Sequence, residues 1–402
     1  MRKQHGFRSN TRLDDALDVF LDHVSRIERS ETVVLEDADA RVAASDVEAE
    51  RNVPGYDRAA MDGYAVRAED TYGASTESPS SLEVTEGEVE EGEAVAVSTG
   101  EEIPKGADAV VMVEDTRQVG GMVEIETGVS RGKNVGNAGE DVAVGDSVVD
   151  EGHRLRPSDI AVLRSLGIDE VEVYDKPEVA VIPTGEELVE SDPDPGEIIE
   201  TNGEMVSNYV ERWGGRPRYG EIVEDDFDAI SEAVVDAADA DLVVTTGGSS
   251  VGERDLTPEV IDENGEILVH GVGIKPGHPV GLGVVEGTPV VMLPGYPVSC
   301  VVNSFLFVRP AVRELGSIDA PPDPTVDCVL DEKINSEVGK RTFTRVSVER
   351  RDGEHIGVPT RTSGAGVLSS VSEADAVIET GEENEGYDAG EVIEAVYWEW
   401  GC

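Results

Sequence analysis

The stretch from Asp241 to Pro258 constrains this chain more than any other part of its sequence. Leu242 to Thr245 is an apolar and β-branched run without polar alternation, which predicts a strand buried on both faces of a parallel sheet. Residues 246–252 contain three glycines and two serines, so their backbone N–H groups can approach an oxyanion closely. Glu253 and Asp255 follow, which predicts an oxyanion bound together with Mg²⁺. The loop alone is equally consistent with a glycine-rich connection carrying two solvated acids.

Strands and helices alternate between residues 178 and 315, which predicts an α/β domain with a parallel sheet and helices on both faces. Acids follow three of its predicted strands, as Glu187, Asp225 and Asp255. Because open α/β sheets bind ligands at the carboxyl ends of their strands, these acids are expected to converge. Lys275 adds a cation in a loop rich in glycine and proline.

The segments on either side of this domain have a different pattern. Residues 11–30 have apolar residues at helical spacing, and residues 156–167 form a second helix pattern that begins with proline and ends with glycine. Residues 82–149 hold short strands separated by glycine-rich turns, which predicts a compact inserted β domain. Short β segments return from residue 326 onward and predict a small C-terminal β domain.

The composition is strongly acidic. Lys and Arg total 32 against 86 Asp and Glu, so the formal net charge is −54, and only 4% of residues are aromatic. This combination can indicate disorder, but the acids lie within well-patterned strands and helices. We expect instead a folded, halophilic protein from a cytoplasm of molar salt, where the Debye length is about 3 Å. The same charge argues against nucleic acid or an anionic membrane as a partner.

The cysteines and the apolar segments exclude other classes of protein. Three widely spaced cysteines form neither a zinc pattern nor a disulfide framework. The chain has no apolar run of about twenty residues, and its first residues lack the apolar core of a signal peptide. We therefore expect a soluble, cytoplasmic protein.

Seven motifs, taken in chain order, closely resemble those of the molybdopterin molybdenumtransferases, the MoeA family, which is related to the E domain of gephyrin. The resemblance runs from about residue 11 to the C-terminus. The motifs are Pro54-Gly55 with Met61–Val66, Ser98–Gly100, Gly139–Asp141, Thr184–Leu188, Thr246–Asp255, Lys275–Gly277 and Pro294–Ser299.

The resemblance implies a reaction and a multidomain fold of α/β and β parts. The reaction is Mg²⁺-dependent insertion of molybdate into adenylylated molybdopterin, with release of AMP, in molybdenum cofactor biosynthesis. The fold is an elongated homodimer whose active cleft is shared between subunits, and a molybdopterin adenylyltransferase is the expected upstream partner. The implied domains are a helical and extended linking domain (1–50 and 142–176), an inserted β domain (51–141), a three-layer α/β molybdopterin-binding domain (177–320) and a C-terminal β barrel (321–402).

The resemblance also implies the site residues. Glu187, Asp225 and Asp255 would hold Mg²⁺ and take part in catalysis. Asp62, Thr99 and Asp141 would be catalytic residues that the other subunit contributes across the cleft. The implied substrate-binding residues are Gly247, Gly248, Ser249, Ser250, Lys275, His278, Pro294, Gly295 and Ser299.

Two positions depart from the family pattern, and three alternatives stay open. His278 stands where the family often has Lys, and Tyr296 where it often has Asn, so a preference for tungstate over molybdate is conceivable. A molybdopterin-binding scaffold without turnover is disfavoured by the full set of acids. A nucleotide-cleaving enzyme that shares only the α/β domain is disfavoured by Met61–Val66 and the β insertion.

Overall fold

The computed structural model describes residues 11–247, 256–319, 321–360 and 366–400. The chain divides into two compact units. The larger unit consists of residues 1–31, 40–42 and 173–402, and the smaller unit of residues 32–39 and 43–172. Within the described ranges, no helix is both long and apolar enough to span a membrane.

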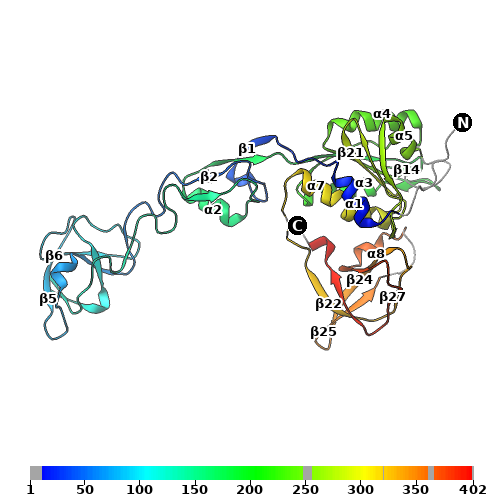
Figure 1. The fold of residues 1–402 in the computed structure, drawn as a ribbon. Helices are drawn as coiled ribbons and strands as arrows, with labels where there is room; N and C mark the ends of the chain where they lie inside the picture. The colour runs from blue at the N-terminus through cyan, green and yellow to red at the C-terminus, as the bar shows by residue number, and fades with distance from the viewer. Residues whose placement is uncertain (1–10, 248–255, 320, 361–365, 401–402) are drawn as a thin grey trace. The chain divides into compact units, whose positions relative to one another are not determined.

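The smaller unit is built on a six-stranded sheet of order β7-β4-β6-β5-β9-β8 (Figure 1). Its centre is buried on both faces, because Tyr64 and Val66 enter one apolar cluster and Ala65 enters another. The strands predicted between residues 82 and 125 are confirmed, and so is the helix after Arg156. The elements are β4 (Gly63–Val66), β5 (Ser80–Thr85), β6 (Glu93–Val97), β7 (Ala109–Met112), β8 (Thr116–Val119), β9 (Met122–Ile125) and α2 (Pro157–Ser165).

The larger unit contains a six-stranded sheet of order β16-β13-β17-β21-β20-β18. Its strands are β13 (Glu178–Pro183), β16 (Arg216–Tyr219), β17 (Leu242–Thr246), β18 (Gly265–His270), β20 (Gly281–Val285) and β21 (Thr288–Leu293). The first four strands of the order are parallel, as predicted. The expectation of a wholly parallel sheet is wrong, because β20 and β18 are antiparallel. Glu286 and Gly287, both at positive φ, join β20 to β21 directly, and so short a turn permits only an antiparallel hairpin.

Helices cover both faces of this sheet and make the predicted three layers (Figure 1). Leu242 and Val244 of β17 pack into one apolar cluster, and Val243 between them packs into the other. The first cluster includes α1 (Leu13–Leu21), α3 (Asn202–Arg212), α6 (Pro297–Asn303) and α7 (Arg309–Leu315), and the second includes α4 (Phe227–Asp236) and α5 (Thr257–Asn264).

The first helix is shorter than its sequence pattern. α1 ends at Leu21, although the apolar spacing continues to Ile27. Val24 and Ile27 are nevertheless buried in the same core as α1. The backbone N–H of Ile27 donates to the carbonyl of Leu315 at 2.9 Å, a bond to the end of α7 in place of a helical bond. The pattern therefore identified buried residues correctly but overestimated the helix.

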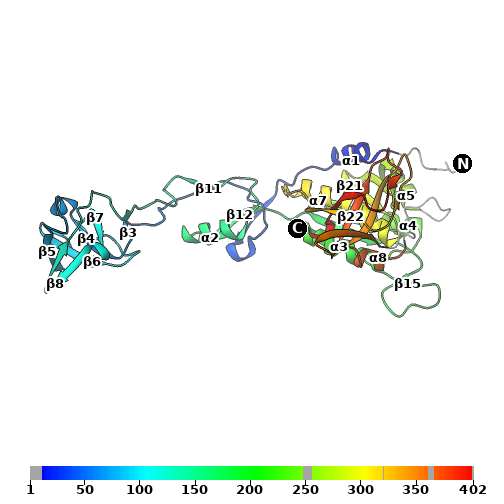
Figure 2. The same ribbon diagram turned by 90° about the horizontal axis from the view of Figure 1, so that it is seen from below.

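The C-terminal strands close into a barrel. The order is β24-β25-β22-β28-β26, and a further pairing of β26 with β24 completes the ring. The strands are β22 (Thr325–Leu330), β24 (Arg341–Arg351), β25 (Glu354–Pro359), β26 (Ala376–Thr380) and β28 (Val392–Val396). β24 is long enough to bond β26 through its first half and β25 through its second. β19 (Ile274–Lys275), from the α/β part of the unit, adds to β24 in parallel (Figure 2 shows this unit from below).

Aromatic side chains hold the barrel against the α/β part. Tyr209, Trp213 and Phe305 lie on the α/β side, and Phe343 and Trp398 on the barrel side. The rings of Phe305 and Trp398 stack with centroids 4.9 Å apart across this boundary. Aromatic residues are only 4% of the chain, so their concentration here identifies this boundary as a packed interface.

The remaining short elements connect these parts. Two-stranded pairings join β1 to β12, β2 to β11, β3 to β10, β14 to β15 and β23 to β27. Their bounds, with that of the last short helix, are β1 (Ser30–Val34), β2 (Val47–Glu48), β3 (Arg58–Ala59), β10 (Val135–Gly136), β11 (Ser147–Val149), β12 (Glu170–Tyr174), β14 (Leu188–Val189), β15 (Ile198–Ile199), β23 (Ile334–Asn335), β27 (Gly386–Tyr387) and α8 (Ser369–Ser372).

Candidate functional site

A cavity of about 1170 Å³ lies in the larger unit, lined by residues from the carboxyl ends of β13, β17 and β21 and from the C-terminal barrel. We call it the sheet-end cavity. Eight of the residues predicted from the sequence line it together. They are Glu187, Asp225, Gly247, Lys275, His278, Pro294, Gly295 and Ser299. Gly248, Ser249, Ser250 and Asp255 lie outside the described residues.

The floor of the cavity is formed where β13 and β17 end. The N–H of Thr184 donates to the carbonyl of Thr246 at 3.2 Å, and the N–H of Gly247 donates to that of Leu293 at 3.0 Å. Gly247 has φ +123°, and a Cβ there would lie 2.3 Å from the carbonyl oxygen of Thr184. Only glycine therefore fits at this position, directly after the end of β17.

The structure separates the roles of two neighbouring acids. Asp226 is the N-cap of α4, because its Oδ1 accepts the N–H groups of Asp228 and Ala229 at 3.1 and 3.0 Å. Asp225 lines the sheet-end cavity, and its Oδ2 accepts the N–H of Glu186 at 3.5 Å. Of this pair, Asp225 is therefore the candidate for chemistry, while Asp226 starts a helix.

The donor atoms at the strand ends fit Mg²⁺. Glu187 and Asp225 supply carboxylate oxygens, and the hydroxyls of Thr184 and Thr246 are buried and have no hydrogen-bond partner among the described residues. Mg²⁺ prefers oxygen ligands and retains several waters, so a set of two or three carboxylates is sufficient. Among residues 11–247, 256–319, 321–360 and 366–400, no group of three or more His, Cys, Asp or Glu is clustered for a metal. The expected third carboxylate, Asp255, is outside those ranges.

Cations also line the sheet-end cavity. Lys275, Lys333 and Lys340 line it, and they are three of only seven lysines in a chain with a net charge of −54. Arg345 also lines it, donating from Nε to Ser370 Oγ at 3.2 Å. Burial lowers the pKa of the Arg345 guanidinium. So many cations in so acidic a protein indicate a site for an anion.

One carboxylate lies among these cations. Glu337 lines the cavity and forms an ion pair with Lys340, with Oε1 and Nζ 3.1 Å apart. The hydrogen bond from Lys340 lowers the pKa of Glu337, and the charges of Lys275 and His278 lower it further. The negative charge of Glu337 therefore partly neutralises the cations that would attract an anion.

His278 is oriented by the backbone. Its Nδ1 lies 2.5 Å from the carbonyl oxygen of Val272. Because a carbonyl only accepts, Nδ1 carries the hydrogen in this contact. The ring is thus held with its Nδ1 edge toward the protein, at the border of the sheet-end cavity.

Sequence reasoning missed Glu200, Thr201 and Asn202, which also line the cavity. The carboxylate of Glu200 is buried and accepts the hydroxyl of Tyr219 at 2.6 Å and the N–H of Gly203 at 2.7 Å. Burial and the hydrogen bond to Glu200 raise the pKa of the Tyr219 hydroxyl. The Thr-Asn pair at the start of α3 is the sequence signal that could have identified these residues. Thr and Asn are typical of helix starts, and in an α/β domain helix starts lie near the carboxyl ends of strands, where the cavity is.

The smaller unit holds the other three predicted residues. The Oδ1 of Asp62 accepts from the Thr99 N–H at 2.6 Å and from its hydroxyl at 2.8 Å. These two bonds lower the pKa of Asp62, which is exposed. Asp141 lines a second cavity, of about 360 Å³. The other residues of that cavity are Val53, Pro54, Arg58 and Glu140.

Models of three protein families match successive parts of the chain. They are described as the MoeA N-terminal region (domain I and II), which matches residues 11–167, the probable molybdopterin binding domain, which matches 180–314, and the MoeA C-terminal region (domain IV), which matches 327–398.

Whole proteins match over nearly the full length. A putative molybdopterin biosynthesis protein of Methanocaldococcus jannaschii is 37% identical over 94% of this chain and 94% of its own. The molybdopterin molybdenumtransferase of Bacillus subtilis is 32% identical over 93% of this chain and 91% of its own. Two crystal structures of the molybdopterin biosynthesis MoeA protein from Pyrococcus horikoshii have TM-scores of 0.84 and 0.81 at 36% and 35% identity. They cover 97% of this chain and 99% and 100% of theirs.

Proposed function

Because the chain belongs to the MoeA family, we propose that it is a transferase that inserts molybdenum into molybdopterin during molybdenum cofactor biosynthesis. Its substrates would be molybdate and adenylylated molybdopterin, and AMP would leave. The observation that carries this proposal is the sheet-end cavity, which Glu187, Asp225, three lysines and an arginine line together. Such a cavity suits two anionic substrates, of which one is a phosphate ester and the other is an oxyanion.

The cations would bind and position these anions. Lys275 and Lys340 are point charges for phosphate or molybdate, and Arg345 offers a planar donor fork from a buried position. Gly247 lines the cavity where β17 ends, and its N–H already donates to the Leu293 carbonyl, so a phosphate cradle would begin just after it. Gly248, Ser249 and Ser250 would extend the same cradle.

Glu187, Asp225 and Asp255 would hold Mg²⁺, which when bound would supply positive charge that polarises the phosphoryl oxygen. The residues around them hold the geometry: Glu186 donates to Asp225, and the buried hydroxyls of Thr184 and Thr246 provide additional oxygens beside the carboxylates.

We further propose that the active form is a homodimer with a shared cleft. Asp62, Thr99 and Asp141 of one subunit would meet the sheet-end cavity of the other. Asp62 suits a polar role there, because it is exposed and Thr99 stabilises its charged form. The four domains would follow the boundaries expected from the sequence, at about residues 50, 141, 176 and 320. The reaction would take place in a cytoplasm of high salt, downstream of a molybdopterin adenylyltransferase.

The test is molybdate-dependent release of AMP from adenylylated molybdopterin, measured in molar salt and without oxygen. Asp225→Asn is compared with Asp226→Asn, which makes the same chemical change one residue along and keeps a good helix cap. We expect Asp225→Asn to lower the rate about 100-fold and Asp226→Asn to leave it nearly unchanged.

Other outcomes would contradict parts of this proposal. Tight molybdopterin binding without AMP release, with either molybdate or tungstate, would favour a scaffold without turnover. Release that depends on tungstate and not molybdate would identify a tungstate-preferring paralogue. An equal loss of AMP release in Asp225→Asn and Asp226→Asn would contradict a specific role of Asp225 in the reaction.

A further inference from the structure

Tyr296 differs from the other aromatic residues of the larger unit. Its side chain lines the sheet-end cavity, yet the residue is 67% exposed. Its ring stacks on none of the described aromatic residues, and its hydroxyl makes no hydrogen bond within the described part of the chain. By contrast, Tyr209, Trp213 and Phe305 pack against one another beneath the barrel.

Hydrogen bonds hold the backbone at Tyr296 in place. Tyr296 is the N-cap of α6, and its carbonyl accepts the N–H of Cys300 at 2.9 Å. The preceding carbonyl, of Gly295, accepts the side-chain amide of Asn202 at 2.8 Å. Tyr296 therefore leaves a fixed turn and places an uncommitted aromatic surface in the cavity.

Gly366 of the barrel lies beside one edge of that surface. A Cβ at Gly366 would lie 3.4 Å from Cδ1 of the Tyr296 ring, an ordinary contact distance. The barrel thus approaches Tyr296 with a residue that has no side chain. An aromatic surface left open in this way, within a cavity rich in cations, fits a flat ring that carries a phosphate.

We propose that Tyr296 is a stacking platform that positions the planar heteroaromatic ring of the substrate, either adenine or pterin. This inference rests on the proposed function, which supplies a substrate containing both rings. Aromatic rings bind flat heterocycles by offset stacking, with little dependence on hydrogen bonding. Lys275 and Lys340 line the same cavity and would hold the phosphate while Tyr296 holds the ring. The cavity volume of about 1170 Å³ is sufficient for both groups.

The test measures binding by calorimetry in molar salt, with three probes. AMP carries adenine and phosphate, ribose 5-phosphate carries phosphate without a ring, and 6-hydroxymethylpterin carries the pterin without phosphate. The variants are Tyr296→Leu, which keeps apolar surface but removes the aromatic ring, and Tyr296→Phe, which keeps the ring. Tyr72→Leu is the matched control, because Tyr72 is 63% exposed and lies in the smaller unit.

We expect Tyr296→Leu to weaken binding of AMP or of the pterin about tenfold. The probe whose binding is weakened identifies which ring, adenine or pterin, stacks on Tyr296. Ribose 5-phosphate should bind all proteins equally, and Tyr296→Phe and Tyr72→Leu should resemble the wild type. Equal affinity of wild type and Tyr296→Leu for both ring probes would overturn the proposal, as would failure of both to bind the wild type.

The outcome is separable from that of the proposed reaction. If Tyr296→Leu binds both ring probes normally while molybdate-dependent AMP release persists, the stacking role fails and the transferase stands. If the wild type releases no AMP but its binding of a ring probe depends on Tyr296, the transferase fails and the ring site stands.

Discussion

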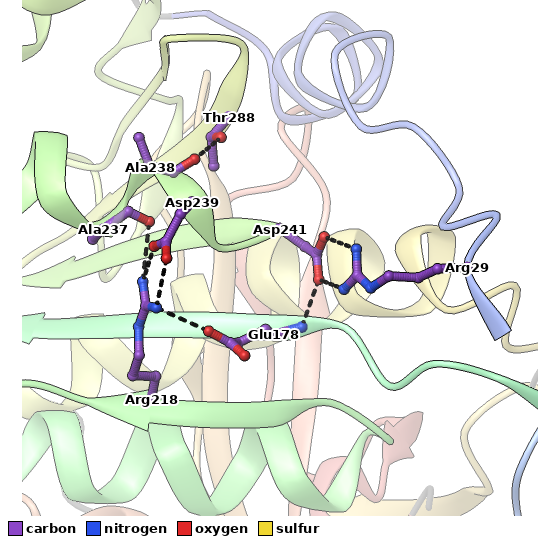
Figure 3. A network of polar contacts seen from close by, with 8 residues as sticks. All are labelled: Arg29, Glu178, Arg218, Ala237, Ala238, Asp239, Asp241 and Thr288. Atoms are coloured by element: carbon purple, nitrogen blue, oxygen red, sulfur yellow. Dashed lines mark hydrogen bonds and ion pairs between the residues drawn. The ribbon is translucent and has the colours of Figure 1, made fainter. Parts of the chain in front are cut away.

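The two ends of the α/β sheet treat polar groups in opposite ways. At the amino ends, charged groups are paired (Figure 3). Arg29 donates to both carboxylate oxygens of Asp241, at 2.9 and 2.5 Å, and Asp241 also accepts the N–H of Glu178 at 2.7 Å. Arg218 pairs with Asp239 at 2.5 Å and with Glu178 at 3.0 Å. Every one of these contacts joins segments of the fold to each other.

At the carboxyl ends of β13 and β17, buried polar groups are without a hydrogen-bond partner among the described residues. The hydroxyls of Thr184 and Thr246 are buried and have no hydrogen-bond partner in the described ranges. Such atoms lower stability, because they lose water without gaining a partner. The comparison teaches that polar groups support the fold at the amino ends and are unpaired at the carboxyl ends, so removing one polar group should cost stability at the first end and not at the second.

The largest effect is expected at Gly247. Gly247→Ala places a Cβ against the Thr184 carbonyl at a φ of +123°, so it should lower the free energy of unfolding by about 3 kcal/mol and abolish AMP release. Gly287→Ala is the matched control, because Gly287 has φ +92° and no atom within 4 Å of the added Cβ. It should cost only about 1 kcal/mol and preserve activity. Similar losses in the two variants, measured by urea unfolding, would contradict the importance of the close approach.

Asp241→Ala tests the amino end. It removes a carboxylate that accepts three hydrogen bonds, so the free energy of unfolding should fall by about 2 kcal/mol. AMP release per folded molecule should stay unchanged, because Asp241 lies at the opposite end of β17 from the sheet-end cavity. A variant that keeps its stability but loses turnover would break the division between the two ends.

The same substitution at both ends should change stability in opposite directions. Thr246→Val removes a hydroxyl that has no described partner, and we expect it to leave stability unchanged or raise it by up to about 1 kcal/mol. Thr288→Val removes the hydroxyl that donates to the Ala238 carbonyl at 2.7 Å, and we expect a loss of about 1 kcal/mol. Thermal unfolding of the two variants decides the sign. A loss at Thr246 equal to that at Thr288 would show that the Thr246 hydroxyl supports the fold.

The smallest effect concerns pH. The hydrogen bond from Arg218 lowers the pKa of Asp239 below its usual value of 3.8. The resulting stabilisation is fully present above pH 3.8 and is lost as the pH falls through the lower, folded pKa. Arg218→Gln should raise the Asp239 pKa toward 3.8, as followed by carboxyl carbon resonances in NMR titration. An unchanged pKa in the variant would show that the ion pair does not form in solution.

Local patterns predicted much of the fold and one side of the site. The β-branched run of β17 and the glycine after it specified a buried strand that ends at Thr246. Of the three acids that were expected to converge, Glu187 and Asp225 line one cavity, and Asp255 lies outside the described residues. These features depend on residues close together in the sequence, which is why periodicity and turn chemistry identify them.

The barrel side of the site could not be predicted in this way. Lys333, Lys340 and Arg345 line the cavity only because Phe343 and Trp398 dock the barrel against Phe305 of the α/β part. Nothing in a short window of sequence specifies which loop of one domain meets the strand ends of another. Tyr296 was visible as an unusual residue, but its exposure inside a cavity depends on this same docking.

The pairing of β19 with β24 limits how this protein can be recombined with its relatives. The N–H of Arg341 donates to the Gly273 carbonyl at 2.8 Å, and its guanidinium binds both carboxylate oxygens of Asp14 at 2.9 and 2.8 Å. A chimera joined between α7 and β22 would therefore have to match partners at two separate places in the chain, Asp14 and residues 273–275. If they fail to match, Arg341 and Thr342 at the start of β24 lose the strand that pairs with them. The C-terminal barrel is therefore inherited together with Asp14 and the 273–275 segment, and a functional exchange has to move all of them.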